Sequence, residues 1–265
     1  MLKFLARERH WEYTIAIELM KRSLAVTIFV LASWRAAWAE TAQEIADGII
    51  FARGGKAKLQ SIQSGRITGI VSMEDEQGTF VLEWKHPQLI RMEITLGGKT
   101  IVKASDGQNA WKLDPLAGST KPVPMDAVES KRFMADMDFD GPFLDPASKG
   151  VQIELIDKEM LDPSLVWKLK VTHKSGEVEF YYVESTGHFV LLKESAKTEG
   201  SKAQTQRQYF RDFQMVGDLW FPFTTILSTE DSTALVTLSV QDVELNPKIE
   251  ETRFRLSSNS AAAMP

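Results

Sequence analysis

The sequence predicts a mainly β protein in which one antiparallel sheet curves strongly, or closes incompletely into a barrel, with a few helices lying in its mouth. Apolar residues recur at helical spacing in only a few stretches. From residue 65 onward they alternate with polar residues, and Gly, Asp, Asn or Ser separates the alternating runs. The few predicted helices cannot cover the apolar face of so many strands, and we therefore expect the sheet to curl. A curled sheet would leave an apolar concavity that a ligand could fill. A fully packed two-sheet sandwich without a cavity fits the same alternation equally well.

The first 39 residues have the pattern of a secretory signal peptide. Met20 to Arg22 gives a short basic start, Leu24 to Ala32 is an unbroken apolar or small run, and Ala37 to Ala39 is a small-x-small cleavage site. The apolar run is much shorter than the roughly 20 residues that a membrane-spanning helix needs. We therefore expect residues 1–39 to be removed on export, with Met20 as the true initiator and Glu40 as the first mature residue. An amphipathic or membrane-anchoring helix is the alternative.

Helices are expected in two regions of the mature chain. Between Glu40 and Ile62, isoleucine and leucine recur at helical spacing on either side of Gly54 and Gly55, which predicts two helices with a glycine break. Met125 to Met137 predicts a third, central helix. The preceding residues 115–124 are rich in Pro, Gly and Ser and predict a loop.

About eleven strands fill the rest of the mature chain. The clearest spans Leu89 to Leu96, where every second residue is apolar, and a matching strand ends at Trp84. Similar runs are predicted at residues 100–105, 109–113, 151–156, 166–172, 177–183, 189–194, 205–215, 221–227 and 234–245. The candidate ligand groove is the apolar face of the first two strands, formed by Phe80, Leu82, Trp84, Ile90, Met92 and Ile94.

Composition excludes several classes of function. The chain has no cysteine, which excludes disulfides, thiolate metal sites and cysteine nucleophiles. Its net charge of −5 becomes −8 without the first 39 residues, which hold six basic and three acidic residues. This balance argues against nucleic acid or an anionic membrane surface as the main partner. No phosphate-binding loop, dinucleotide fingerprint or G-x-S-x-G motif is present, so we expect no enzyme and no cofactor.

The histidines and one acidic run are the remaining candidates for metal chemistry. Apart from the histidine in the first 39 residues, the histidines lie at strand ends or turns without ligand spacing, and we expect them to be exposed. Asp136 to Gly141 matches the D-x-D-x-D-G opening of a calcium loop, but the twelfth place, which should be glutamate, is Ala147. We therefore expect a solvated acidic turn and no metal.

One segment resembles a known family. Glu83 to Met92 reads E-W-K-H-P-Q-L-I-R-M, and it is followed by Ser105-Asp106-Gly107, Trp111 and Asp114-Pro115. This order is similar to that of the LolA-like outer-membrane lipoprotein carriers, in which a strand ends in Lys-x-Pro and an Asp-Gly turn leads into a strand that carries Trp and ends at Asn/Asp-Pro. The resemblance spans residues 40–256, and residues 80–115 are its specific part.

The resemblance implies an unclosed half-barrel of about eleven strands with a helical lid. The biased composition after Leu256 predicts a flexible tail at residues 257–265. The resemblance further implies a monomeric periplasmic carrier that shields the acyl chains of lipoproteins or of a related lipid and exchanges them with inner- and outer-membrane transfer proteins. An envelope-stress regulatory module on the same half-barrel is the alternative. Such a sensor typically adds a second domain after the half-barrel, and we expect none after Leu256.

Two positions carry over from the family residue by residue. The carriers keep an arginine just before the proline, which latches the lid helices by hydrogen bonds to backbone carbonyls. This place holds His86, which can make one such bond but cannot reproduce a five-donor fork. Ile90 takes the place of the large apolar residue that faces the acyl chain.

Overall fold

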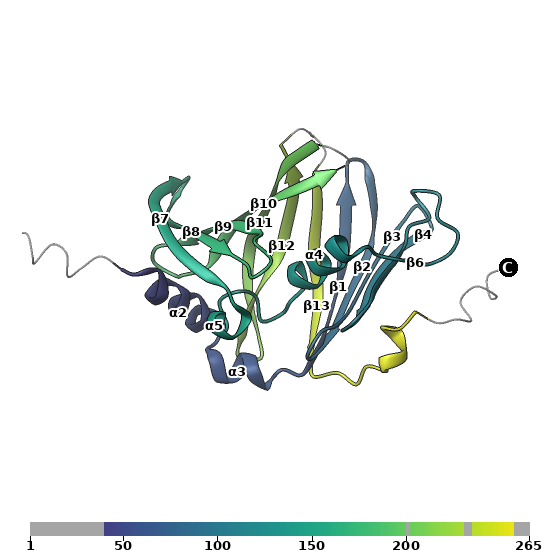
Figure 1. Ribbon diagram of the computed structural model, residues 1–265, viewed down its shortest axis with the longest axis horizontal. Helices are drawn as coiled ribbons and strands as arrows, with labels where there is room; N and C mark the ends of the chain where they lie inside the picture. Colours follow the sequence, from purple (N-terminus) through teal and green to yellow (C-terminus); the bar gives the residue numbers. More distant parts are fainter. Residues whose placement is uncertain (1–39, 200–201, 231–234, 257–265) are drawn as a thin grey trace, which may run out of the picture. The chain divides into compact units, whose positions relative to one another are not determined.

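The computed structural model describes residues 40–199, 202–230 and 235–256, so the predicted signal peptide and tail lie outside the described residues. Thirteen strands form one sheet (Figure 1). They are β1 (Ser64–Met73), β2 (Glu76–Lys85), β3 (Leu89–Leu96), β4 (Lys99–Asp106), β5 (Ala110–Leu113), β6 (Val123–Pro124), β7 (Gln152–Leu161), β8 (Ser164–Thr172), β9 (Val178–Glu184), β10 (Val190–Glu199), β11 (Lys202–Val216), β12 (Leu219–Thr229) and β13 (Val236–Leu245).

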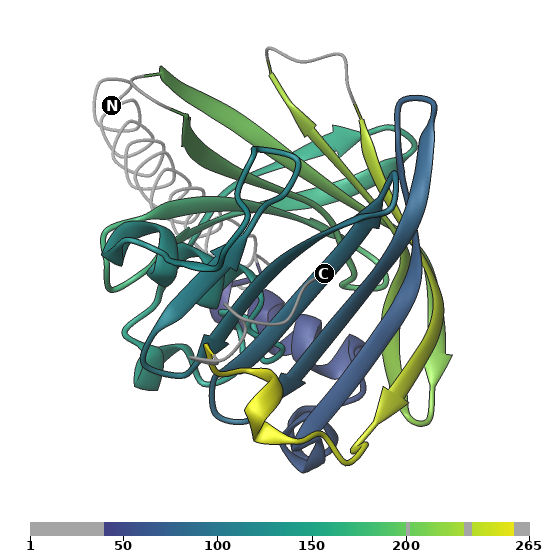
Figure 2. The same ribbon diagram turned by 90° about the vertical axis from the view of Figure 1, so that its right-hand side faces the viewer.

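The sheet is antiparallel and is not closed into a barrel. Its strand order is β6-β5-β4-β3-β2-β1-β13-β12-β11-β10-β9-β8-β7, so the first long strand pairs with the last, while the two ends of the order, β6 and β7, are not hydrogen-bonded to each other in the described chain. Figure 2 shows the curvature of this sheet. The unclosed half-barrel is confirmed, and the two-sheet sandwich is wrong. The alternation predicted from residue 65 onward came without bounds for β1, and no pattern predicted β6, whose two residues lie in the expected loop.

The helices are α2 (Ala42–Ala52), α3 (Lys56–Ser61), α4 (Ala127–Asp136), α5 (Pro146–Lys149) and the short 3-10 helix η1 (Glu251–Arg253). No helix in the described ranges is long and apolar enough to cross a membrane. The isoleucines of α2 pack against the sheet: Ile45 and Ile49 share one buried cluster with Trp167 and Val183. The pair of N-terminal helices and the central helix are therefore confirmed, and α2 lies at the centre of the largest core.

The central helix α4 is fixed at both its start and its inner side. The Asp126 carboxylate accepts hydrogen bonds from the backbone N–H groups of Val128 (2.9 Å) and Glu129 (2.8 Å), which satisfies two of the free donors of the first turn. Phe133 is buried in a cluster with Ile90 of β3. This helix therefore covers part of the face that the sequence predicts as the groove.

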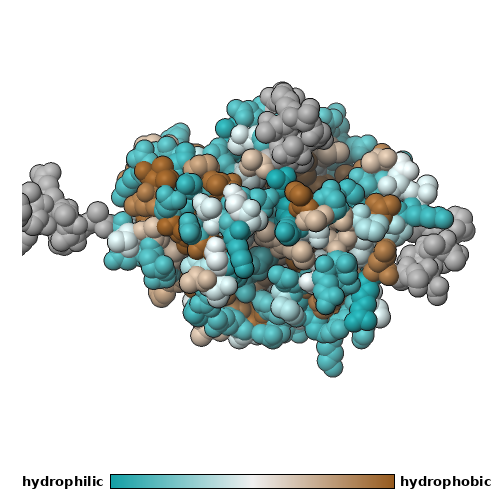
Figure 3. All heavy atoms as spheres, in the orientation of Figure 1, coloured by the Kyte–Doolittle hydropathy of each residue, from teal (hydrophilic) through white to brown (hydrophobic). Residues whose placement is uncertain are grey.

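The edge strand β7 carries exposed apolar residues. Brown side chains gather over the β7–β8 hairpin in Figure 3, where Ile156 and Met160 of β7 are 48% and 64% exposed. The charged residues Glu154, Asp157 and Lys158 are interspersed among them. Charges along an edge oppose pairing with the edge of another sheet, which protects this long free strand.

The segment after β13 docks on the face of the sheet opposite the predicted groove. Phe254 is completely buried there, and its carbonyl oxygen accepts a hydrogen bond from Nε1 of Trp111 at 3.1 Å. Arg253 donates to the buried carboxylate of Glu83 at 2.7 Å, and its own carbonyl oxygen accepts from Arg91 at 2.9 Å. The C-terminal segment is thus an integral part of the fold.

We expect Phe254→Ala to destabilise the protein by about 3 to 5 kcal/mol, because it removes a fully buried aromatic ring and leaves a cavity. Chemical denaturation followed by tryptophan fluorescence measures this loss. Leu256→Ala is the matched control, because Leu256 is 44% exposed two residues further on. Equal stability of the two variants would contradict the docking of Phe254.

Candidate functional site

The six apolar residues predicted to form the groove share one face of the sheet. The register between β2 and β3 places Phe80 opposite Ile94, Leu82 opposite Met92, and Trp84 opposite Ile90. Residues directly opposite each other in an antiparallel pair project to the same side. The period-two pattern therefore identified a common face correctly.

These residues have different neighbours on that face. Leu82 and Trp84 line the central cavity. Ile90 and Met92 pack instead in the cluster beneath α4, and Ile90 is only 3% exposed. Phe80 and Ile94, the pair at the far end of β2 and β3, do not line the cavity. The central cavity is thus displaced from the predicted groove toward α2, β10, β11 and β12.

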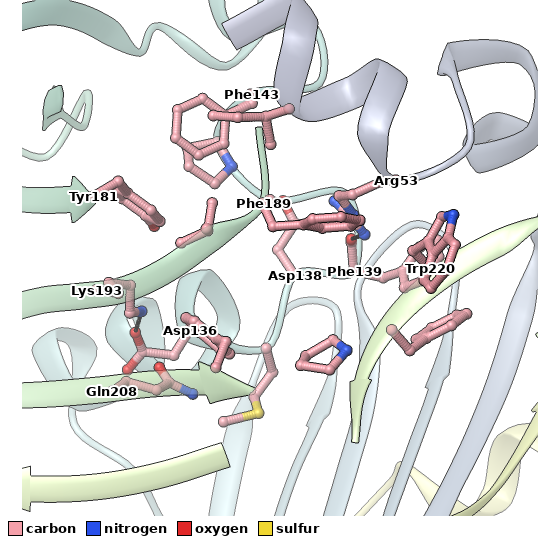
Figure 4. A pocket seen from close by; sticks show the side chains of 18 of the residues that line it. Arg53, Asp136, Asp138, Phe139, Phe143, Tyr181, Phe189, Lys193, Gln208 and Trp220 are labelled. Atoms are coloured by element: carbon pink, nitrogen blue, oxygen red, sulfur yellow. Dashed lines mark hydrogen bonds and ion pairs between the residues drawn. The ribbon is translucent and has the colours of Figure 1, made fainter. Parts of the chain in front are cut away.

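The cavity has a volume of about 280 Å³ and a largely aromatic wall (Figure 4). It lies between the concave face of the sheet, the C-terminal end of α2 and the segment between α4 and α5. Its aromatic lining residues are Trp84, Phe139, Phe143, Tyr181, Phe189, Phe210, Phe213, Trp220 and Phe221. A cavity of roughly 150 Å³ holds a benzene molecule, so this one has room for about a dozen carbon atoms.

Phe139 is the part of the α4–α5 segment that lies deepest in the aromatic wall. Its ring stacks on Trp84 with centroids 4.8 Å apart, and it faces Phe221 at 6.2 Å. Offset stacking of this kind adds favourable energy to the burial of the rings. Phe139 thereby connects β2 with β12 across the cavity.

Arg53, at the end of α2, holds the Phe139 segment in place. Its Nη2 donates to the carbonyl oxygen of Phe139 at 2.7 Å and its Nη1 to that of Asp140 at 3.1 Å, while the guanidinium lies 5.3 Å above the Phe139 ring. Burial lowers the pKa of Arg53 from its ordinary value, and the charges of Asp140 and Asp138 oppose this shift. The fork of donors to backbone carbonyls is therefore supplied by α2.

His86, at the predicted latch position, does not make such a fork. Its Nε2 lies 3.6 Å from Oδ1 of Asp140, which is beyond hydrogen-bond distance. Burial raises the pKa of Asp140, and the neighbouring His86 opposes that shift. His86 thus lies beside the same segment that Arg53 binds, but the backbone contacts belong to Arg53.

A network of charged side chains forms the polar end of the cavity. Lys193, which is 8% exposed, donates to Asp136 at 2.9 Å and lies 3.1 Å from Glu179. Glu179 also contacts Nε2 of His173 at 2.7 Å and accepts from Tyr181 at 2.8 Å. Because Asp136 is the last residue of α4, this network fastens the C-terminal end of α4 to β9 and β10.

The network shifts the ionisation of its members. Burial raises the pKa of Glu179, but the bond to His173, the charge of Lys193 and the bond from Tyr181 outweigh it and lower that pKa to about 2. The bond to Glu179 raises the pKa of His173. A charged carboxylate and a protonated imidazole therefore stabilise each other at the polar end.

The expectation of exposed histidines is wrong. The side chains of His86 and His173 are only 23% and 19% exposed, because each lies against a carboxylate. His188 lines the cavity, stacks near Trp167 with ring centroids 5.0 Å apart, and abuts α2 so closely that a Cβ atom at Gly48 would lie 2.1 Å from its ring. These histidines were predicted to lie at exposed strand ends or turns, but neighbouring parts of the protein cover their side chains.

The acidic run Asp136 to Gly141 places its carboxylates beside different cations. Asp136 binds Lys193, whereas Asp138 accepts from Lys149 at 2.6 Å, and the same ammonium group donates to the carbonyl oxygen of Gly141 at 2.7 Å. Within the described ranges, no group of three or more acidic or histidine side chains could hold a metal ion. Lys149 therefore neutralises the turn.

We expect thermal melts in calcium and in chelator to coincide, because the run lacks the bidentate glutamate and Lys149 already binds Asp138. Differential scanning fluorimetry measures both melts. A rise of several degrees in calcium that disappears in Asp138→Asn would contradict the assignment of this run as a structural turn.

Comparison with known proteins identifies the fold. No protein-family model and no curated protein matches the sequence. A solved LolA superfamily protein from Nitrosomonas europaea superposes with a TM-score of 0.58 at 14% identity, covering 82% of this chain and 98% of that one. The chain has a LolA-like fold. At this level of identity the likeness shows the fold alone.

Two further solved structures are similar to this chain in fold. A DUF1329 family protein from Desulfovibrio piger has a TM-score of 0.56 at 10% identity, covering 85% of this chain and all of the other. An outer membrane lipoprotein-sorting protein domain from Vibrio parahaemolyticus has a TM-score of 0.52 at 12% identity, covering 80% and 95%. The resemblance of residues 80–115 to the LolA-like carriers thus predicted the fold correctly.

Sequence reasoning missed the lid contact and most of the aromatic wall. Arg53 lies 86 residues before Phe139, and no local pattern connects them. The signal available for the wall was composition: Phe210, Phe213, Trp220 and Phe221 fall within twelve residues, which is a dense aromatic stretch for a sheet strand and its neighbour.

Proposed function

We propose that this protein is a periplasmic carrier that holds the acyl chain of a lipoprotein, or of a related lipid, in the aromatic cavity. The observation that supports this most directly is a 280 Å³ cavity with a largely aromatic wall inside a LolA-like fold. One structural neighbour is an outer membrane lipoprotein-sorting protein domain. The carrier acts as a monomer and exchanges its cargo with transfer proteins of the inner and outer membranes.

The energy of the proposed complex comes from the burial of methylene groups. Each buried methylene contributes about 0.8 kcal/mol, so about ten of them contribute roughly 8 kcal/mol before the cost of association. Leu82 and Trp84 supply apolar surface on one side, and Phe139 and Phe221 supply it on the other. This arrangement favours a chain-like apolar ligand.

The polar groups of the cavity favour binding over catalysis. All four charged side chains among the described lining residues are engaged with protein partners: Arg53 with backbone carbonyls, Asp136 with Lys193, and Asp138 with Lys149. A general base or an activated nucleophile needs to reach a substrate atom. In this proposal the protein carries its ligand without chemical change.

Titration with a fluorescent acyl probe tests this function. A dansyl-labelled medium-length fatty acid should bind saturably with one probe per chain, gain fluorescence and be displaced by acylated lipopeptide or phospholipid. Linear, non-saturable fluorescence would contradict the proposal and would favour a regulatory module that uses the fold to bind other proteins.

In this function Arg53 fastens the segment that closes the cavity. We expect Arg53→Lys to increase the dissociation rate of the bound probe roughly tenfold, because an ammonium group cannot reproduce two hydrogen bonds worth about 1 kcal/mol each. Stopped-flow displacement measures the rate. Arg211→Lys, at an exposed position of β11, is the control. A rate unchanged by Arg53→Lys would show that the segment does not close the site.

A further inference from the structure

The sheet has an unpaired stretch beside the cavity. The pairs between β10 and β11 begin at Leu192 and Tyr209 and continue toward the β10–β11 turn. The remaining part of β11, from Phe210 to Val216, pairs with β12 alone among the described strands. No backbone pairs join the start of β10 to the second half of β11 in the described chain, so side chains close the wall between them.

The cavity reaches both faces of the sheet at this place. Trp220 and Phe221 are consecutive in β12, and successive side chains of a strand point to opposite faces, yet both line the cavity. Phe210 and Phe213 of β11 likewise line it although they are three positions apart in the strand, and Asp212 between them has a positive φ of 53°. The cavity thus extends into the wall of the half-barrel.

Three aromatic rings fill this stretch. Phe189, just before β10, packs on Phe213 with centroids 4.5 Å apart and on Trp220 at 5.7 Å, and Trp220 is 37% exposed. We call these three residues the aromatic portal. Figure 4 shows Phe189 and Trp220 near Arg53 on one side of the cavity, while Lys193, Asp136 and Gln208 lie on the other.

We infer that an acyl chain longer than about a dozen carbons leaves the cavity at its distal end through the aromatic portal, while its polar end stays near Lys193. The inference rests on the proposed function. The cavity holds about a dozen carbon atoms, so such a chain exceeds it by several methylenes. The portal offers these methylenes aromatic surface where lining residues come from both faces of the sheet.

Opening the portal requires little reorganisation. A path through any paired part of the sheet would break backbone hydrogen bonds and leave buried polar groups unsatisfied. At the portal, rotation of Phe189 away from Phe213 and Trp220 separates only ring contacts. The outer end of this path lies beside Met215, which is opposite Trp220 in the β11–β12 pair and is 59% exposed.

Site-specific quenching tests the route, and the absence of cysteine in the chain makes single labels straightforward. Met215→Cys carries a bimane label at the outer end of the portal, and Ser195→Cys carries it near the polar end, where Ser195 shares a smaller cavity with Asp136. Each labelled protein is titrated with a fatty acid of about ten carbons and with one of about eighteen, both brominated at the terminal carbon.

We expect the long chain to quench the label at Met215→Cys severalfold more than the short chain, with little quenching by either at Ser195→Cys. Binding of both chains without quenching at Met215→Cys, or quenching at Ser195→Cys by the long chain, would overturn the route while leaving the carrier function intact. Failure of both chains to bind unlabelled protein, measured by displacement of the dansyl probe, would instead overturn the proposed function and the inference with it.

Discussion

Leu82→Glu is expected to reduce the affinity for an acyl probe by at least about a hundredfold while the protein stays folded. Leu82 is half-buried and lines the cavity, so a carboxylate there has space but makes part of the apolar surface polar. Forcing a charge against a bound hydrocarbon costs several kcal/mol, and each 1.4 kcal/mol is about a factor of ten in affinity. Probe titration and circular dichroism together measure binding and fold.

Two variants bracket this result. Thr79 lies on the same strand, at an exposed position of the opposite face, so the Thr79→Glu variant should bind the probe normally. Ile90→Glu should unfold the protein or release α4, because Ile90 is 3% exposed in the packed cluster with Phe133. Unchanged probe binding by folded Leu82→Glu would show that the ligand lies elsewhere.

Stability should fall as the pH drops from about 5.5 to about 3.5, with Glu179 as a main contributor. Its pKa is about 2 in the folded protein, against an ordinary value of 4.5, so its stabilisation is complete above 4.5 and is lost as the pH falls toward 2. A shift of this size corresponds to about 3 kcal/mol. His173 has a raised pKa, so its part of the same contact is complete below 6.5 and is lost as the pH rises through the folded pKa.

Urea denaturation at these two pH values, on wild type and on Glu179→Gln, measures the effect. The variant should be less stable than wild type by about 3 kcal/mol at the higher pH, and the difference should shrink as the pH falls. Glu177→Gln is the control, because Glu177 acts on His173 through its charge alone and lies 3.6 Å from Arg132 of α4. An identical pH dependence in Glu179→Gln and wild type would contradict the network at the polar end.

The elements that local pattern determines were predictable, and the contacts that join distant segments were not. The alternation from Leu89 to Leu96 predicted strand β3 and the face that it shares with β2, because the period of two is a property of the strand itself. The same pattern could not show which part of that face α4 covers. That depends on Phe133, whose partner Ile90 is 43 residues away in sequence.

The family resemblance at His86 was also unable to predict a contact between distant segments. The resemblance placed the lid contact at the residue before the proline, and His86 does lie next to Asp140. The donors to the carbonyl oxygens of Phe139 and Asp140 come from Arg53, and a motif comparison at position 86 cannot reveal an arginine that directly follows α2. Likewise, the sequence neighbours of Asp212 do not signal its positive φ, which lies between the cavity-lining residues Phe210 and Phe213.

Native mass spectrometry of the protein isolated gently from its native cells tests the central claim most directly. If the cavity carries an acyl chain, a fraction of the protein should bear one acylated lipopeptide or lipid per chain, and organic extraction should release it. Leu82→Glu prepared in the same way should be free of it, and Thr79→Glu should retain it. Wild-type protein that contains no acyl species and takes none up from vesicles of bacterial lipid would contradict the carrier function.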